Sequence, residues 1–214
     1  MLIIGFIIIG LMLFLLAGTI HYWQAWVYLA VGFASMIPYV LYVVNNPILL
    51  ENRTKGGPLS EQRPIQKIIT LIGGLPLIAV FVIPALDRRF GWTNVSPWLS
   101  LIGDIFIIVS MWMVVQVFKE NSYGSATIEI SKDQKVISTG PYAIVRNPMY
   151  SSAILYCFAL SLSLGSYWGL IPAVLMIFFF AWRLSDEEKM LEKDLPGYTE
   201  YQAKVRWHII PGIF

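Results

Sequence analysis

Six apolar segments fill most of this 214-residue sequence and restrict the folds open to it. They cover residues 2–18, 24–44, 68–86, 97–118, 149–164 and 167–183. Each of the first four is long enough, as a helix rising 1.5 Å per residue, to cross a hydrocarbon core of about 30 Å. The last two are shorter, and only Gly165 and Ser166 separate them. We therefore expect four membrane spans followed by a short C-terminal helical hairpin.

The composition agrees with that expectation. Hydrophobic residues make up 57% of the chain and charged residues 13%, whereas soluble domains carry about 25% charged residues. The predicted fold class is an all-α integral membrane protein with about six apolar helices in one structural domain. A net charge of +2 gives no indication of nucleic-acid binding. The first apolar segment follows Met1 with no basic region between them, so we expect a retained span rather than a signal peptide.

The distribution of Lys and Arg predicts the orientation. With six segments, both termini lie on the same side as the loops 45–67 and 119–148. That side holds every Lys and Arg of the chain except Arg88 and Arg89. Because cytoplasmic loops concentrate basic residues, we expect both termini, both loops and a helical C-terminal tail to be cytoplasmic. Loop 45–67 is turn-rich, which favours a solvated linker, with a substrate-gating loop as the alternative.

A proline-punctuated segment begins before the fifth apolar run and extends into its first residues. It reads TGPYAIVRNPMY and covers residues 139–150. Two prolines and a glycine prevent a continuous helix here. Irregular backbone at membrane depth has to be buried in protein or line a cavity. We therefore expect this segment to form one wall of a ligand site.

Arg183 and Glu187 form the second chemical signal. They lie four residues apart at the end of the last apolar segment, so they share one helix face. Arg183 could simply extend to the headgroups and make an ordinary salt bridge. Alternatively, Arg183 binds an anionic group that arrives from the bilayer, and Glu187 binds a cationic or hydroxylated group of a cofactor. Both interpretations stay open at this point.

Other polar residues give weaker signals. Asp104 lies within the fourth span, where we expect an interhelical or interfacial structural role. His208 is also expected to be structural. Two histidines and one cysteine without clustered spacing predict no metal site. The chain has no P-loop and no strand-flanked dinucleotide motif, so helices and loops would have to hold any nucleotide-like cofactor.

The C-terminal half carries a family resemblance. The run KVISTGPYAIVRNPMY, two short apolar segments and then RLSDEEKMLEKDLPGYTEYQAKVRWHIIPGIF resemble the isoprenylcysteine carboxyl methyltransferase family of integral membrane methyltransferases. Related phospholipid methyltransferases share much of this pattern. The resemblance covers roughly residues 116–214. It implies a C-terminal catalytic region within residues 119–214, with a cofactor-binding loop, the hairpin and the tail, and this region follows the four spans that the apolar segments predict within residues 1–118.

The resemblance implies an S-adenosylmethionine pocket. Arg183 matches the arginine that meets the substrate, and with Glu187 it forms the expected catalytic pair. Asn147 stands where the family usually has histidine, and asparagine cannot titrate. The matched cofactor-binding residues are Glu129, Gln134, Lys135, Val136, Ile137, Tyr142, Asn147, Pro148, Met149, Tyr150 and Glu187.

The expected function is methyl transfer from S-adenosylmethionine to a lipophilic acceptor, specifically carboxyl O-methylation of an isoprenylcysteine-like substrate. The alternatives are a phospholipid N-methyltransferase, a thiol S-methyltransferase, an NADPH-dependent reductase of the steroid 5-alpha-reductase type, and a non-catalytic lipid-binding protein. The expected partners are a lipophilic or lipidated acceptor and membrane lipid. The sequence does not indicate an oligomeric state.

Overall fold

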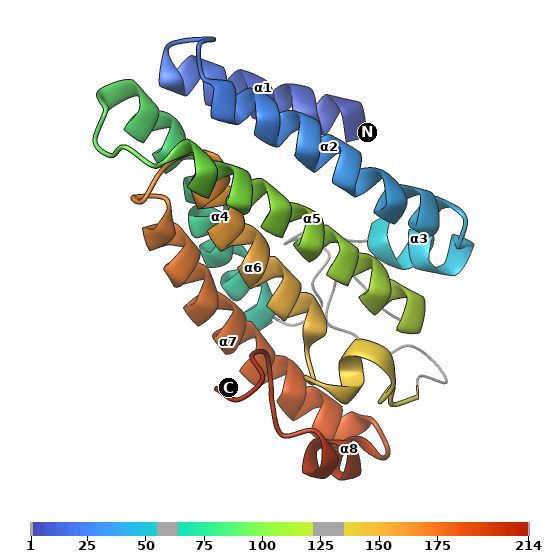
Figure 1. Cartoon of the computed structure of the whole chain (residues 1–214). Coiled ribbons are helices and arrows are strands. Elements are labelled where there is room, and N and C mark those ends of the chain that lie inside the picture. Colours follow the sequence, from blue (N-terminus) through green and yellow to red (C-terminus); the bar gives the residue numbers. More distant parts are fainter. Residues whose placement is uncertain (1, 55–63, 122–134, 214) are drawn as a thin grey trace. The chain divides into compact units, whose positions relative to one another are not determined.

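The computed structural model describes residues 2–54, 64–121 and 135–213, and all regular structure in these ranges is helical (Figure 1). A short 3-10 helix, η1, lies between the fifth and sixth α-helices. The elements in chain order are α1 (Leu2–Ala17), α2 (Trp23–Val44), α3 (Pro47–Thr54), α4 (Pro64–Phe90), α5 (Pro97–Glu120), η1 (Gly140–Ala143), α6 (Pro148–Ser163), α7 (Leu170–Asp194) and α8 (Tyr198–Lys204).

Each predicted apolar segment forms a helix. Three helices, α2, α4 and α5, are long and apolar enough to cross a membrane by length and composition. The helices α1 and α6 are apolar but contain 16 residues each. These helices are typical of an integral membrane protein, and the number of crossings stays a prediction.

Two details of the polar segments follow from proline and glycine. The predicted linker 45–67 is helical at both ends, because Pro47 begins α3 and Pro64 begins α4. Proline suits a first helical position, where its missing N–H is not needed and its fixed φ already fits a helix. The predicted charged extension of the last apolar helix is confirmed, since α7 continues to Asp194. Gly197, with a φ of 86°, then permits the turn into α8.

The described chain forms two compact units. Unit 1 contains residues 1–37, 74–112 and 153–177, and unit 2 contains residues 38–73, 113–152 and 178–214. The helices α2, α4, α5, α6 and α7 contribute residues to both. The predicted division of the chain after residue 118 stays a prediction.

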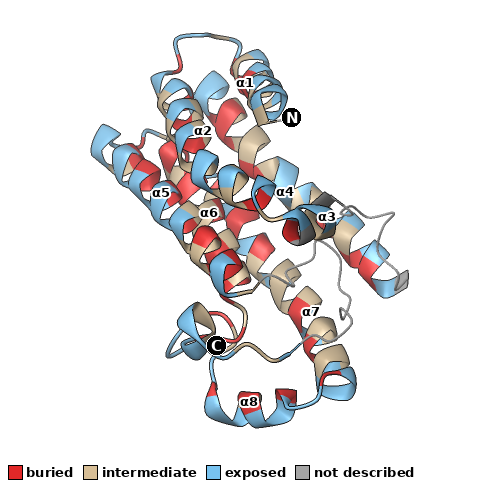
Figure 2. Cartoon of the chain, turned by 90° about the vertical axis from the view of Figure 1, so that its right-hand side faces the viewer, coloured by how far each residue is buried: buried red, intermediate tan, exposed pale blue. Residues whose placement is uncertain are grey.

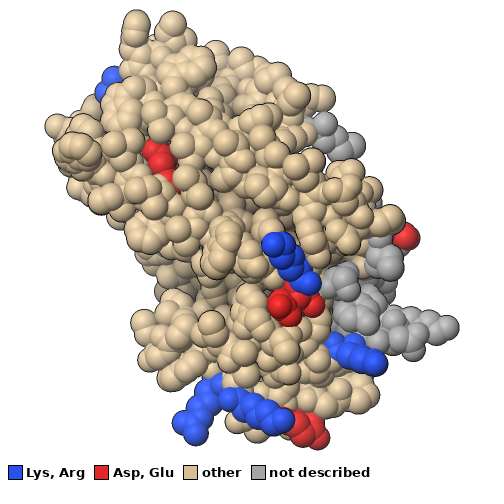
Figure 3. All heavy atoms as spheres, turned by 45° about the vertical axis from the view of Figure 1, so that its right-hand side comes forward, with Lys and Arg blue, Asp and Glu red and all other residues tan. Residues whose placement is uncertain are grey.

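The outer faces of the helices are apolar. Figure 2 shows exposed residues along each long helix, and many of these are large and hydrophobic, such as Leu15, Leu75 and Trp98. Charged side chains are few and scattered over the face drawn in Figure 3. A soluble protein rarely leaves so much apolar surface uncovered, whereas lipid tails would cover it.

Within unit 1, α5 and α6 approach each other closely at Gly103. A Cβ atom added to Gly103 would lie 2.5 Å from the backbone nitrogen of Ser163 and 2.8 Å from the carbonyl oxygen of Ala159. The next residue, Asp104, accepts a hydrogen bond of 2.5 Å from the Ser163 hydroxyl. Asp104 therefore makes an interhelical contact, and its interhelical or interfacial structural role stays a prediction. Small residues at such crossings are typical of helix packing in membranes.

We expect Gly103→Ala to destabilise the protein by about 1–3 kcal/mol, because the new methyl group meets the backbone of α6, which cannot rotate away. Gly74→Ala is the matched control, since its Cβ would meet nothing within 4 Å. Alanine is also the better helix former by about 1 kcal/mol. Unfolding of both variants in detergent, followed by circular dichroism, tests the prediction. Equal stability of the two variants would contradict it.

Candidate functional site

The segment 139–150 has the irregular backbone that its sequence predicts. It begins with η1, continues through a turn, and enters α6 at Pro148. Gly140 has a φ of 56°, and a Cβ atom there would lie 2.6 Å from the Glu120 side chain. The Thr139 hydroxyl donates a hydrogen bond of 2.7 Å to Glu120 at the end of α5. The segment is thus anchored against α5 before α6 begins.

Tyr150 and Glu187 meet between α6 and α7. The Tyr150 hydroxyl donates a hydrogen bond of 2.6 Å to the Glu187 carboxylate. The Tyr150 ring is buried, and its centroid lies 5.2 Å from that of Phe180. The same hydroxyl also interacts with the Arg183 side chain. The predicted pair, Arg183 and Glu187, therefore converges on one tyrosine of the predicted wall.

Tyr142 on η1 is held by Asn121, which follows α5, and by Tyr201 of α8. Its hydroxyl accepts a hydrogen bond of 2.8 Å from the Asn121 side chain, and its carbonyl oxygen accepts one of 2.7 Å from the Tyr201 hydroxyl. Burial raises the pKa of Tyr142 to about 12, with the negative charge of Glu187 acting in the same direction and the Asn121 hydrogen bond in the opposite one. The Tyr142 phenol therefore keeps its proton at neutral pH.

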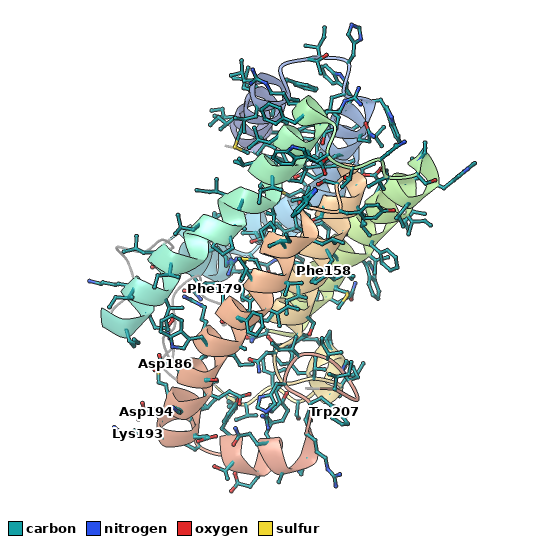
Figure 4. The ribbon with its side chains drawn as sticks, turned by 90° about the vertical axis from the view of Figure 1, so that its left-hand side faces the viewer. Phe158, Phe179, Asp186, Lys193, Asp194 and Trp207 are labelled. Carbon is teal, nitrogen blue, oxygen red and sulfur yellow. The ribbon has the colours of Figure 1, made fainter. Side chains whose placement is uncertain are left out.

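Arg183 lies in a polar network between α4 and α7. Its Nη1 donates hydrogen bonds of 2.8 Å to the Thr70 hydroxyl and 3.3 Å to the Gln66 carbonyl oxygen. The Gln66 amide nitrogen donates to the Asp186 carboxylate. Figure 4 labels Asp186 on α7, beside the end of α4 that carries these residues. Arg183 is thus held inside unit 2 by specific partners on another helix.

Sequence reasoning missed a buried ion pair beside this network. Arg146 donates to both carboxylate oxygens of Glu188, at 3.0 and 3.1 Å. The Asn147 amide donates to the same carboxylate at 3.1 Å, and the His208 ring lies 3.1 Å from it. Both members of the pair are buried. In the sequence, Arg146 resembles the other basic loop residues and Glu188 belongs to an acidic run. The only sequence signal that distinguishes Arg146 is its position within the proline-punctuated segment.

The C-terminal segment satisfies the irregular backbone of this region. The backbone N–H of Arg146 donates to the carbonyl of Trp207 at 2.8 Å, and that of Asn147 donates to the carbonyl of His208 at 2.9 Å. The Ser151 hydroxyl donates to the carbonyl of Ile209 at 2.5 Å. Trp207 is labelled in Figure 4. His208 belongs to the segment that packs on the turn before α6, and its structural role stays a prediction.

The remaining predicted residues lie in different surroundings. Val136 packs on the apolar cluster of Leu195, Tyr198, Tyr201 and Val205 that seats α8. Met149 packs on another cluster, which contains Val43, Leu49 and Phe118. Lys135 is exposed, Ile137 is half-buried and Pro148 is buried at the start of α6. Glu129 and Gln134 lie outside the described residues. Among the described side chains, no group of three or more His, Cys, Asp and Glu residues could hold a metal ion.

A comparison with known protein families gives a match to the region that carries most of these side chains. Residues 98–196 match the phospholipid methyltransferase family. The match covers a little under half of the chain and contains η1, α6, α7 and all of α5 except Pro97. It confirms the resemblance to membrane methyltransferases and supports a methyltransferase activity for this chain. The residues Gln66 and Thr70 on α4 and the segment from residue 197 onward lie outside the phospholipid methyltransferase match. No curated protein matches the chain.

We expect Arg146→Met to destabilise the protein by about 3–5 kcal/mol, because it leaves the Glu188 carboxylate buried without its cation. Arg206→Met is the matched control, since Arg206 is exposed on the same C-terminal segment that packs over the site. The double variant Arg146→Met with Glu188→Leu should recover part of the loss. Thermal unfolding in detergent measures all three. A single variant as stable as the control would show that the pair is unimportant for folding.

Proposed function

We propose that the chain is an S-adenosylmethionine-dependent methyltransferase acting on a lipophilic acceptor, with carboxyl O-methylation of an isoprenylcysteine-like substrate as its reaction. The convergence of Arg183 and Glu187 on the Tyr150 hydroxyl carries this proposal. It places a cation and an anion side by side within the matched segment. One charge suits an anionic acceptor and the other suits a cationic cofactor.

The side chains of the candidate site fit S-adenosylmethionine. That cofactor carries a positive sulfonium and an ammonium group, and once bound it would supply a methyl group already activated for transfer. Glu187 would attract its positive charge, and the half-buried ring of Tyr142 and the buried ring of Tyr150 offer aromatic contact to a cation. The strip from Lys135 to Ile137 would line the cofactor through its backbone. Glu129 and Gln134 remain predicted contributors to the same pocket.

The remaining task of the protein is alignment. Arg183 would orient the acceptor carboxylate through a forked ion pair. A carboxylate with a pKa near 4 is ionised at neutral pH, so no general base is required. The packed rings of Tyr150 and Phe180 would exclude water from the reacting groups. Holding the two reactants in line then supplies most of the rate advantage.

Two features of the site are compatible with a carboxylate acceptor, which needs no base. An amine has to lose a proton when it is methylated, and residue 147 is an asparagine that cannot accept one. Tyr142 keeps its own proton at neutral pH. The phospholipid N-methyltransferase reading stays the second candidate, because the matched family acts on phospholipids by its description.

We further propose that the site faces the cytosol. Its residues lie on the loops and helix ends that carry nearly all Lys and Arg of the chain. In this arrangement the cofactor would enter from the cytosol, and a lipid-like acceptor would arrive laterally from the bilayer.

We expect purified protein to bind S-adenosylhomocysteine, and Glu187→Gln to weaken that binding by about tenfold to a hundredfold, because a hydrogen bond to a charged group contributes about 1.5–3 kcal/mol. Asp194→Asn is the matched control, since it removes an exposed carboxylate from the same helix. Isothermal titration calorimetry measures each affinity. If the folded wild-type protein showed no heat at millimolar ligand, the methyltransferase proposal would be wrong.

We expect Arg183→Ala to raise the KM for a prenylcysteine analogue by about tenfold or more, because the acceptor loses a charge-assisted contact. The affinity for S-adenosylhomocysteine should change much less, since Arg183 faces the acceptor in this proposal. A methyl-transfer assay and the same calorimetry separate the two effects. Equal loss of cofactor and acceptor binding would remove the acceptor role from Arg183.

A further inference from the structure

We propose that Gln66 and Thr70 of α4 are positioning residues that aim the Arg183 guanidinium at an oxyanion of the acceptor. The inference deepens the proposed function and rests on it. It assigns a part of the acceptor site to a helix that lies outside the matched segment. The ligand chemistry is an amphiphile that carries an oxyanion, either a carboxylate or a phosphate.

Gln66 bridges two charged residues of α7. Its side chain is fully buried. The carbonyl oxygen accepts from Arg183 at 3.3 Å, and the amide nitrogen donates to Asp186. A guanidinium can only donate and a carboxylate can only accept, so the amide fits in one orientation alone. If the Gln66 amide were flipped, its NH2 group would face the Arg183 donor and its carbonyl oxygen would face the Asp186 carboxylate, so neither hydrogen bond could form.

Thr70 supplies the second contact from the same face of α4. It follows Gln66 by four residues, which places both side chains on one side of the helix. Its hydroxyl accepts from the same Arg183 nitrogen at 2.8 Å. Both acceptors are uncharged, so they fix this nitrogen without placing a further negative charge beside it. The guanidinium is a rigid planar fork, so holding one nitrogen restricts the plane of all its donors.

Close packing keeps α4 in place for these contacts. Gly73 lies one turn beyond Thr70 and continues the same face. A Cβ atom added to Gly73 would lie 2.0 Å from the Phe179 ring of α7. Residues 66, 70 and 73 therefore form a stripe on α4 that packs against α7. Its polar members hold Arg183 and its glycine allows the two helices to approach.

The oxyanion could come from two sources. In a prenylated cysteine it is the carboxylate that receives the methyl group. In phosphatidylethanolamine it is the phosphate, which would anchor the lipid beside its amine. A forked, fixed guanidinium binds both kinds of oxyanion in a bidentate way. Specificity for charge in the acceptor would then depend on α4 as well as on Arg183.

The test measures binding rather than turnover. One probe pair is an N-acetyl prenylcysteine and its methyl ester, which lacks the charge. The other is a short-chain phosphatidylethanolamine and an alkylamine of matched length, which lacks the phosphate. We expect wild-type protein to prefer the charged member of one pair by about tenfold or more. The pair that shows the preference identifies the source of the oxyanion.

The variants then test α4. Gln66→Leu and Thr70→Val should reduce the preference to about threefold or less, while S-adenosylhomocysteine still binds as in wild type. Thr70→Ser keeps the hydroxyl and should keep the preference. Lys67→Leu changes an exposed neighbour on α4 and should also keep it. If Gln66→Leu fails to fold, the Thr70→Val and Thr70→Ser comparison decides, since it changes only one small side chain.

Two outcomes would overturn the inference in distinguishable ways. If Thr70→Val and a folded Gln66→Leu keep the full charge preference and bind S-adenosylhomocysteine normally, α4 does not position Arg183 and the proposed function stands. If wild-type protein binds neither S-adenosylhomocysteine nor any probe, the proposed function itself is wrong and the inference falls with it.

Discussion

The ion pair between Arg146 and Glu188 is the constraint on which the candidate site depends. Both charges are buried, and a buried charge is tolerated only when its partner and its hydrogen bonds are in place. The pair joins the turn before α6 to α7, and Asn147 and His208 complete its hydrogen bonding. Three stretches that are distant in the sequence therefore have to assemble together before this carboxylate can be buried.

The adjacent glutamates on α7 illustrate how this assembly serves the site. Successive residues of a helix point about 100° apart, so Glu187 and Glu188 face different partners. Glu188 is committed to Arg146, and this contact fixes the rotation of α7 about its axis. That rotation directs Glu187 to the Tyr150 hydroxyl. Arg183, one turn earlier, is directed to the same tyrosine and to α4. The contact that Glu188 makes with Arg146 thus determines the direction in which Glu187 points.

Local patterns predicted the parts of the fold that local physics determines. Apolar runs located the helices, the prolines and glycine located the broken segment, and Pro196 with Gly197 located the end of α7. The four-residue spacing of Arg183 and Glu187 placed them on one face. The contacts with Glu188 and Gln66 left no such signal, because their partners are 42 and 117 residues away. The helix α3 was missed because its eight residues are too few and too polar to show a clear period.

Asn147 connects the ion pair of Arg146 and Glu188 with the proposed methyl transfer. Where the resemblance to the isoprenylcysteine carboxyl methyltransferase family implies a histidine, this chain has an amide that donates to Glu188 and cannot exchange a proton. A histidine there could serve both as a hydrogen-bond donor and as a base, whereas asparagine keeps only the first role. Asn147 therefore supports the buried carboxylate and provides no titrating group at this position. Methylation of an ionised carboxylate needs no base, so an asparagine at position 147 is compatible with the carboxylate that Arg183 is proposed to hold.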